Sequence, residues 1–370
     1  MQSSDEVVAK DLDSICRRLD GEFGRMAGSS LLITGGAGFL GYYFVHAVHH
    51  HNRNSQQQDW ISLTVFDNYV RGVPNWTKEL DGDCGVNFYP YDLALPLPDD
   101  MGDFEYIIHA ASIASPNYYR QRPIETMDSN VNGLRALLDH FYRQQRDSKR
   151  VGGFLFMSSS EIYGDPAAEW IPTPETYRGY VSCTGPRACY DEAKRYGETL
   201  CVNFAQQYGL PIRAARPFNN YGPGLKITDR RVLPDFARNI LADQDVSILS
   251  DGTPMRTFCY VSDAIVGYYK ALVRGGVGEA YNVGTETPEI SMADLGHMMV
   301  AAAGDLFGYK GTVVTGQTAD KDYLVDNPNR RCPDISKARK QLDYDPIVPL
   351  EDGLRRLLLW YAANPEGEDA

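Results

Sequence analysis

Short apolar runs alternate with helical patterns along about the first 220 residues, and this alternation limits the folds open to the chain. The helical patterns lie at 39–51, 124–145 and 186–208. The apolar runs have the length of strands that are buried on both faces, and they lie at 31–34, 62–66, 86–89, 106–109, 154–158 and 212–216. Alternation of this kind predicts an α/β fold, in which a doubly wound parallel sheet is covered by helices on both faces.

The 370 residues are too many for one typical core, and this length favours two lobes. After about residue 220 the helical patterns shorten and prolines and glycines become more frequent, which predicts a smaller C-terminal α/β lobe. An amphipathic pattern at 6–19 predicts a helix that packs on the surface. The predicted organisation is an N-terminal extension at 1–28, a first domain at 29–216 with 257–285 threaded back into it, and a second lobe from 217–256 and 286–370.

The charge balance and the cysteine content limit which partners the protein can bind and which cellular compartment suits it. Lys and Arg total 36 against 49 Asp and Glu, a net charge of −13, and such a chain repels the phosphate backbone of nucleic acids. No apolar run reaches the about 18 to 20 residues of a membrane span, and the polar N-terminus has no signal-peptide core. The seven cysteines are odd in number and form no CxxC pair. We therefore expect no nucleic-acid or membrane partner, and a cytoplasmic protein with free thiols.

A glycine-rich loop follows the first apolar run and opens the first helical pattern. Gly35, Gly38 and Gly41 are spaced G-x-x-G-x-x-G, which lets the backbone approach a pyrophosphate at a helix N-terminus. Asp67 ends the second strand, where a carboxylate accepts the ribose hydroxyls of adenosine and repels a 2′-phosphate. Asp92, after the third strand, is placed to reach the adenine. The pattern predicts NAD as cofactor, with further contacts from Phe39, Leu40, Asn68, Leu93 and Ala110.

Tyr190 and Lys194 are four residues apart on a predicted helix, so their side chains lie on one face. A neighbouring ammonium, with the positive nicotinamide nearby, favours phenolate and is expected to lower the pKa of Tyr190. Tyr190 would then take a proton from a sugar hydroxyl while a hydride leaves for NAD. One hydroxyl of the Ser158-Ser-Ser-Glu161 segment that ends the preceding strand, with Ser159 and Ser160 as the candidates, is expected to hydrogen-bond the same substrate oxygen.

Taken together, GGAGFLG, Asp67, the Ser-Ser-Ser-Glu segment and YxxxK resemble the extended short-chain dehydrogenase/reductase group of nucleotide-sugar epimerases, dehydratases and decarboxylases. The resemblance covers about residues 30–360. It implies a Rossmann-type first lobe that binds NAD, a second lobe that binds the nucleoside diphosphate sugar, and a homodimer formed through the helices near 124–145 and 186–208.

Five segments are similar to the UDP-glucuronate decarboxylase branch: 109–119, 158–165, 185–194, 256–263 and 326–335. The resemblance implies that Ser160, Glu161 and Arg331 position the substrate carboxylate and manage the proton that replaces it. Oxidation at C4 makes C6 a β-keto acid, which loses CO₂ without an external base, and return of the hydride gives a UDP-xylose-like product. Which of Glu161 and Arg331 handles the proton stays open.

Two other functions remain open from the sequence: a 4,6-dehydratase or 4-epimerase on another nucleotide sugar, and a non-catalytic NAD-sensing protein. The dehydratases carry an Asp-Glu pair where this chain has Ser160-Glu161, and Ser160 cannot serve as that acid. The retained Tyr190 and Lys194 disfavour a non-catalytic role. The resemblance places UDP-sugar contacts at Tyr119, Asn130, Asn219, Arg231, Arg256 and Tyr260.

Four histidines, His46, His49, His50 and His51, lie at the end of the first helical pattern. No Cys or Asp cluster accompanies them along the chain, so we predict no metal site there.

Overall fold

A seven-stranded parallel sheet lies at the centre of the computed structural model, which describes residues 3–316 and 325–364. The strand order is β11-β6-β5-β4-β1-β2-β3. The strands are β1 (Ser30–Thr34), β2 (Ser62–Asp67), β3 (Val86–Pro90), β4 (Tyr106–His109), β5 (Gly153–Met157), β6 (Ile212–Pro217) and β11 (Ala280–Val283). The predicted doubly wound parallel sheet is confirmed, because the predicted strands are all present and pair in parallel. The chain also returns from its C-terminal part to pair β11 with β6.

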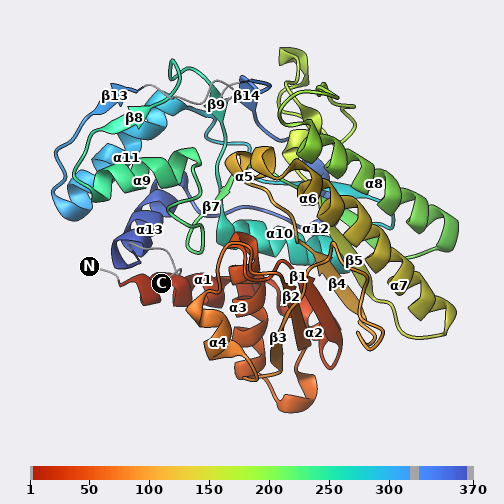
Figure 1. The fold of residues 1–370 in the computed structure, drawn as a ribbon. Coiled ribbons are helices and arrows are strands. Elements are labelled where there is room, and N and C mark those ends of the chain that lie inside the picture. Colours follow the sequence, from red (N-terminus) through yellow and green to blue (C-terminus); the bar gives the residue numbers. More distant parts are fainter. Residues whose placement is uncertain (1–2, 317–324, 365–370) are drawn as a thin grey trace.

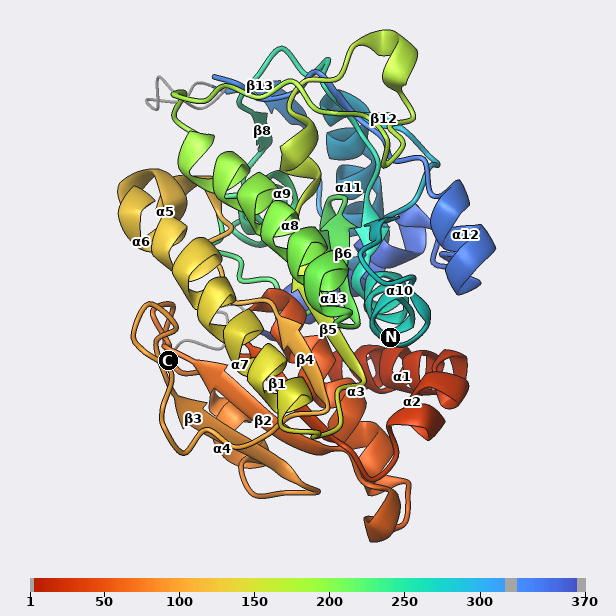
Figure 2. The ribbon, with the colours of Figure 1, turned by 90° about the vertical axis from the view of Figure 1, so that its right-hand side faces the viewer.

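Helices cover both faces of this sheet (Figures 1 and 2). One apolar core joins the sheet to α3 (Phe39–Arg53) and α10 (Val261–Arg274), and a second core joins it to α7 (Leu134–Arg146) and α8 (Ala188–Tyr208). Smaller helices connect these elements: α4 (Asn75–Leu80), α5 (Pro116–Gln121), α6 (Pro123–Asp128) and the 3-10 turns Gln57–Asp59, Ser160–Tyr163 and Ala168–Trp170. Because all strands of the sheet are parallel, the loops that follow them meet at one edge, where ligands bind in such folds.

The C-terminal part builds a smaller α/β lobe, as predicted. Its helices are α9 (Val232–Leu241), α11 (Met292–Phe307), α12 (Ser336–Leu342) and α13 (Leu350–Ala363). Its small sheets have the orders β10-β7, β12-β9-β14 and β13-β8. The strands are β7 (Asn220–Tyr221), β8 (Val246–Ile248), β9 (Met255–Arg256), β10 (Cys259–Tyr260), β12 (Ile290–Ser291), β13 (Val313–Thr315) and β14 (Arg330–Arg331).

The single helix predicted at 124–145 is wrong, because a π-helical turn at Ser129–Gly133 separates α6 from α7. The turn fits Gly133 against the carbonyl oxygen of Leu93: a Cβ at residue 133 would lie 2.9 Å from that oxygen. The amide of Asn130 donates to Thr126 O and to Ser112 Oγ within this turn. Single π turns are frequent at functional sites, and this one brings Asn130 beside the loop after β4.

The N-terminal extension is more than the surface helix that its periodicity predicted. It folds into α1 (Ser4–Arg18) and α2 (Asp20–Met26), and α1 contacts α3, α10 and α13 (Figure 1). Asp11 is fully buried and accepts hydrogen bonds from the hydroxyls of Tyr43 at 2.7 Å and Tyr260 at 2.6 Å. The guanidinium of Arg356 in α13 lies 2.7 Å from the other oxygen of the Asp11 carboxylate. The extension therefore joins the first lobe to the C-terminal part of the chain.

Replacing Asp11 by Ala is expected to lower the free energy of unfolding by about 3 kcal/mol, because it leaves two buried hydroxyls and the partly buried guanidinium of Arg356 without their acceptor. Urea unfolding followed by circular dichroism measures this change. Asp13 is the matched control, because its carboxylate is exposed and pairs with His50 at 3.0 Å. We expect Asp13→Ala to change the free energy by about 0.5 kcal/mol or less. Equal losses in the two variants would contradict the role of Asp11.

All seven cysteines lie within the described residues and are free thiols. Within the same residues, no helix is both long enough and apolar enough to cross a membrane.

Candidate active site

The glycine loop forms a tight passage between β1 and α3. Gly35 has a φ of +73°, which other residues rarely adopt. A Cβ on it would lie 2.6 Å from the Cα of Ala111 in the loop after β4. A Cβ on Gly41 would lie 2.2 Å from the carbonyl oxygen of Gly36. The glycines therefore let α3 start close against the sheet, with its first turn at the edge where strands end.

Asp67, at the end of β2, holds the glycine loop. Its carboxylate accepts from the backbone N–H of Ala37 at 2.9 Å and of Tyr69 at 2.8 Å, and burial raises its pKa. Next to it, the Asn68 amide donates to the Asp92 carboxylate at 3.3 Å. The structure thus brings Asp67, Asn68 and Asp92 together with the glycine loop. The other predicted cofactor contacts lie at the same edge, in the first turn of α3 (Phe39, Leu40) and after β3 and β4 (Leu93, Ala110).

Tyr190, Lys194 and Ser159 meet as predicted. Tyr190 and Lys194 are buried on α8, and the Lys194 ammonium lies 5.6 Å from the centroid of the Tyr190 ring. The Ser159 hydroxyl hydrogen-bonds the Tyr190 side chain and accepts from the backbone N–H of Glu161 at 3.2 Å. Lys194 also donates to the carbonyl of Met157 at 2.7 Å, which fixes the ammonium at the end of β5.

Without the cofactor, the pKa of Tyr190 is raised, and the predicted lowering also requires the positive nicotinamide. Burial raises the pKa of Tyr190 to about 12, against a smaller opposing effect of the Ser159 hydrogen bond. Burial also lowers the pKa of Lys194 to about 7. In both residues desolvation by burial is the largest cause, and it disfavours the charged form. The pair needs a further positive charge before Tyr190 becomes a base near neutral pH.

Glu161 lies between two arginines. One of its carboxylate oxygens is 2.5 Å from Nη2 of Arg187 and 2.6 Å from Nη2 of Arg331. Burial by itself raises the pKa of this carboxyl, but the charges of Arg187 and Arg331 outweigh it and lower the pKa to about 2. Glu161 is therefore ionised throughout the physiological range.

A three-stranded sheet aligns the arginines of the second lobe. In the parallel pair of β9 and β14, Arg256 is the register partner of Arg331. Arg256 is buried and donates to the backbone oxygens of Met255, Pro328 and Asn329. This arrangement brings the predicted diphosphate ligand Arg256 next to the predicted carboxylate ligand Arg331.

Tyr119 and Asn130 lie where substrate contacts were predicted. The ring of Tyr119 stacks on that of Tyr190 with centroids 5.1 Å apart. The Tyr119 hydroxyl and the Asn130 carbonyl oxygen are buried and have no hydrogen-bond partner among the described residues. Buried polar atoms of this kind are normally satisfied, so both are placed to meet a ligand. Ser160 is buried at the start of the 3-10 turn that carries Glu161.

Three other predicted substrate contacts are already engaged within the protein. The hydroxyl of Tyr260 donates to Asp11 in the core, which removes it from the proposed site. Arg231 pairs with the buried Asp229 at 2.7 Å. Asn219 donates to the carbonyl of Thr257, and its oxygen lies 3.5 Å from Nη1 of Arg331, so it supports that arginine.

Arg187 and Asp191 were not among the site residues predicted from the sequence. Arg187 precedes Tyr190 by three residues, which is the helical spacing that places two side chains on one face, and this spacing could have identified it. Asp191 is buried 3.8 Å from Arg187 with one oxygen unpartnered, and burial followed by the charge of Glu161 raises its pKa. Both residues belong to the charged cluster around Glu161.

Arg71 is a second omission. Its guanidinium lies 3.5 Å from Asp229 and 4.1 Å from the centroid of the Tyr118 ring. It therefore ties the loop after β2 to the segment before α9 and to α5. Because its partners are distant in sequence, no local pattern indicates this link.

Comparison with known proteins gives matches over most of the chain. The family model described as "NAD dependent epimerase/dehydratase family" matches residues 31–284. UDP-glucuronic acid decarboxylase 1 of Xenopus tropicalis is 34% identical over 91% of this chain and 73% of its own length. UDP-glucuronic acid decarboxylase 3 of Arabidopsis thaliana is 35% identical over 88% of this chain and 86% of its own.

The fold is also similar to solved structures. UDP-glucose 4-epimerase of Thermotoga maritima, solved with UDP-glucose, aligns with a TM-score of 0.75 at 25% identity, over 91% of this chain and all of that one. UDP-glucuronic acid 4-epimerase of Bacillus cereus, solved with UDP-glucuronic acid and NAD, aligns with a TM-score of 0.70 over 90% of this chain and 98% of that one. At 23% identity, this second likeness concerns the fold alone.

Proposed function

Because the chain belongs to the NAD dependent epimerase/dehydratase family, we propose that it is an NAD-dependent carboxy-lyase that decarboxylates UDP-glucuronate. The proposal rests on one observation, the Glu161 carboxylate between Arg187 and Arg331. Two residues before Glu161, Ser159 hydrogen-bonds the Tyr190 side chain. A guanidinium pair suits a substrate carboxylate. The UDP-glucuronic acid decarboxylases to which the chain is similar act on a substrate that carries one.

The residues at the strand-end edge fit NAD. The Gly35 passage admits no side chain, so a pyrophosphate could approach the backbone at the start of α3. Asp67 and Asn68 would hold the ribose, Asp92 the adenine, and Tyr190 with Lys194 the nicotinamide end. Held by these residues, NAD would supply the hydride acceptor for C4 of the sugar and a positive charge that favours the Tyr190 phenolate.

The residues of this chain would then divide the chemistry. Tyr190 takes the proton of the C4 hydroxyl, aided by the Lys194 ammonium, and Ser159 hydrogen-bonds the same oxygen. The C5–C6 bond then breaks and C6 leaves as CO₂, so its electron pair forms an enolate whose charge lies on the C4 oxygen, where Ser159 and Tyr190 stabilise it by hydrogen bonds. A proton from water adds to C5, and Tyr190 returns its proton to the C4 oxygen when the hydride comes back to C4. Arg331 and Arg187 orient the departing carboxylate, and Arg256 with Tyr119 and Asn130 binds the rest of the nucleotide sugar.

Glu161 acts in this scheme as an ionised partner of the two arginines. A carboxyl with a pKa near 2 carries no proton to donate at neutral pH. Glu161 accepts hydrogen bonds from Arg187 and Arg331, which keeps the two guanidinium groups in place. Its negative charge also weakens their attraction for the substrate carboxylate. Ser160 offers a hydroxyl at the same turn, and it cannot act as the carboxylic acid that loss of water from C6 requires.

The decisive experiment supplies UDP-glucuronate and follows the product by mass spectrometry and the gas by a coupled CO₂ assay. We expect a product lighter by the mass of CO₂, with the C4 ketone reduced. A product lighter by the mass of water would indicate a dehydratase, and one of unchanged mass with inverted C4 a 4-epimerase. Unaltered substrate would contradict the proposal outright.

We also propose a cytoplasmic homodimer that pairs through α6, α7 and α8. Large apolar side chains are exposed on two of these helices, at Ile124, Met127 and Tyr196. Burying such side chains against a second copy removes apolar surface from water. The free thiols suit a reducing compartment.

A further inference from the structure

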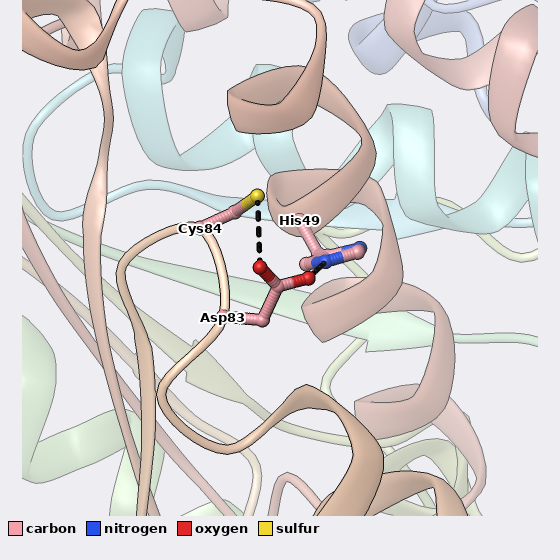
Figure 3. Close-up of side chains that lie close together, drawn as sticks. All are labelled: His49, Asp83 and Cys84. Atoms are coloured by element: carbon pink, nitrogen blue, oxygen red, sulfur yellow. Dashed lines mark hydrogen bonds and ion pairs between the residues drawn. The ribbon is translucent and has the colours of Figure 1, made fainter.

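A cluster of three side chains with different donor atoms lies apart from the proposed active site. The Nε2 atom of His49 is 2.8 Å from Oδ2 of Asp83, and Sγ of Cys84 is 3.4 Å from the other oxygen of that carboxylate (Figure 3). The nitrogen, oxygen and sulfur atoms all lie within 4.8 Å of one another. Along the chain, no Cys or Asp cluster accompanies the histidines. In the folded protein, however, the loop before β3 brings Asp83 and Cys84 to His49.

The cluster lies at the opposite edge of the sheet from the glycine loop. His49 is in the last turns of α3, and Cys84 precedes the first residue of β3 by two positions. The glycine loop follows the carboxyl end of β1, and the strands are parallel. A ligand bound by His49, Asp83 and Cys84 would therefore not touch the proposed NAD or sugar sites.

The surroundings hold His49 and the backbone of Cys84 in place, whereas the Asp83 side chain is 56% exposed and faces solvent. Asn52 is fully buried and donates to the carbonyl of Cys84 at 2.7 Å and to that of Ile61 at 2.9 Å. The loop is tightly turned: Cys84 has a φ of +46° and Gly85 a φ of +79°. A non-glycine residue rarely adopts this conformation, so the fold imposes the position of the thiol. His49 is only 9% exposed.

We propose that His49, Asp83 and Cys84 bind a divalent transition-metal ion of the zinc class. Imidazole, carboxylate and thiolate are the ligands that zinc takes in proteins, with bonds of about 2.0 to 2.3 Å, which places tetrahedral ligand atoms roughly 3.3 to 3.8 Å apart. Here the separations are 2.8 Å from His49 to one Asp83 oxygen and 3.4 Å from Cys84 to the other, so binding an ion requires small shifts of these side chains. Binding replaces the proton between His49 and Asp83 and releases the Cys84 proton to solvent. A water would complete the four ligands, and the ion would fasten α3 to the loop before β3.

The neighbouring histidines do not compete for this role. His46 hydrogen-bonds the carbonyl of Tyr42 within α3. His50 pairs with Asp13 of α1 at 3.0 Å. They therefore provide controls on the same helix.

The test uses the full-length protein after treatment with EDTA and gel filtration. Titration with Zn²⁺ in a calorimeter should show one site, and Co²⁺ should give the near-ultraviolet absorption of a cobalt–thiolate bond. Cys84→Ser should abolish that band and weaken zinc binding at least about 10-fold, as loss of a ligand does. His50→Gln and Cys183→Ser, which removes an exposed thiol elsewhere, should bind as the wild type does.

Thermal unfolding keeps the test decisive if a variant is less stable. Zinc should raise the Tm of the wild type and of His50→Gln, and should leave the Tm of Cys84→Ser and His49→Gln unchanged relative to their own metal-free values. The absence of a zinc site in the wild type overturns the proposal. So does a site that survives Cys84→Ser and His49→Gln, or a site that prefers Mg²⁺ or Ca²⁺ to Zn²⁺.

Discussion

Replacing Tyr190 by Phe should lower kcat on UDP-glucuronate about 10³-fold, the size of a typical general-base contribution. The phenylalanine ring keeps the contact with Tyr119 but has no hydroxyl to remove the C4 proton or to stabilise charge on the C4 oxygen. NAD affinity should stay close to that of the wild type, because the glycine loop and Asp67 are untouched. CO₂ release measures the first effect, and equilibrium dialysis with labelled NAD measures the second.

The matched control is Tyr196→Phe on the same helix. Tyr196 is half exposed and lies on the outer face of α8. We expect its variant to retain full turnover. If Tyr190→Phe also kept most of its turnover, Tyr190 would not be the base, and the proposed chemistry would have to start elsewhere.

The sequence was a good guide to the cofactor edge because each signal there is local. Gly35 follows a strand and opens a helix, Asp67 ends the next strand, and Tyr190 and Lys194 are one helical turn apart. In a parallel sheet, every such signal is carried to the same edge by the topology alone. Sequence order and spatial order then agree.

The charged cluster and the extension were harder to predict because their partners are far apart in the chain. The family resemblance implied that Arg331 acts with Glu161, but no periodicity indicates the register of β9 and β14 that brings the two side chains together. Asp11 looks like an exposed acid in an amphipathic helix, and its burial depends on Arg356 and Tyr260. Likewise, the pKa of Tyr190 depends on how deeply the folded chain buries it.

Replacing Glu161 by Gln should lower kcat about 10²-fold without raising KM for UDP-glucuronate. The amide keeps the size of the side chain but no longer neutralises Arg187 and Arg331. The two guanidinium groups would then bind the substrate carboxylate more tightly. That charge leaves C6 as CO₂ departs, so the added attraction is lost in the transition state and the barrier rises. Steady-state CO₂ release gives kcat and KM separately.

The division between kcat and KM separates this role from a structural one. If Glu161→Gln acted only by disturbing the fold, it would raise KM and lower the Tm. The control is Glu169→Gln, which changes an exposed side chain eight residues after Glu161 and should leave both kcat and KM unchanged. Arg331→Ala provides the opposite case: it removes a carboxylate ligand, so KM should rise as kcat falls.

Because Tyr190 is intact in Glu161→Gln, oxidation at C4 should continue, and NADH absorbance should accumulate with substrate before CO₂ appears. Wild-type kcat in Glu161→Gln would contradict the assignment of Glu161 to the carboxylate site.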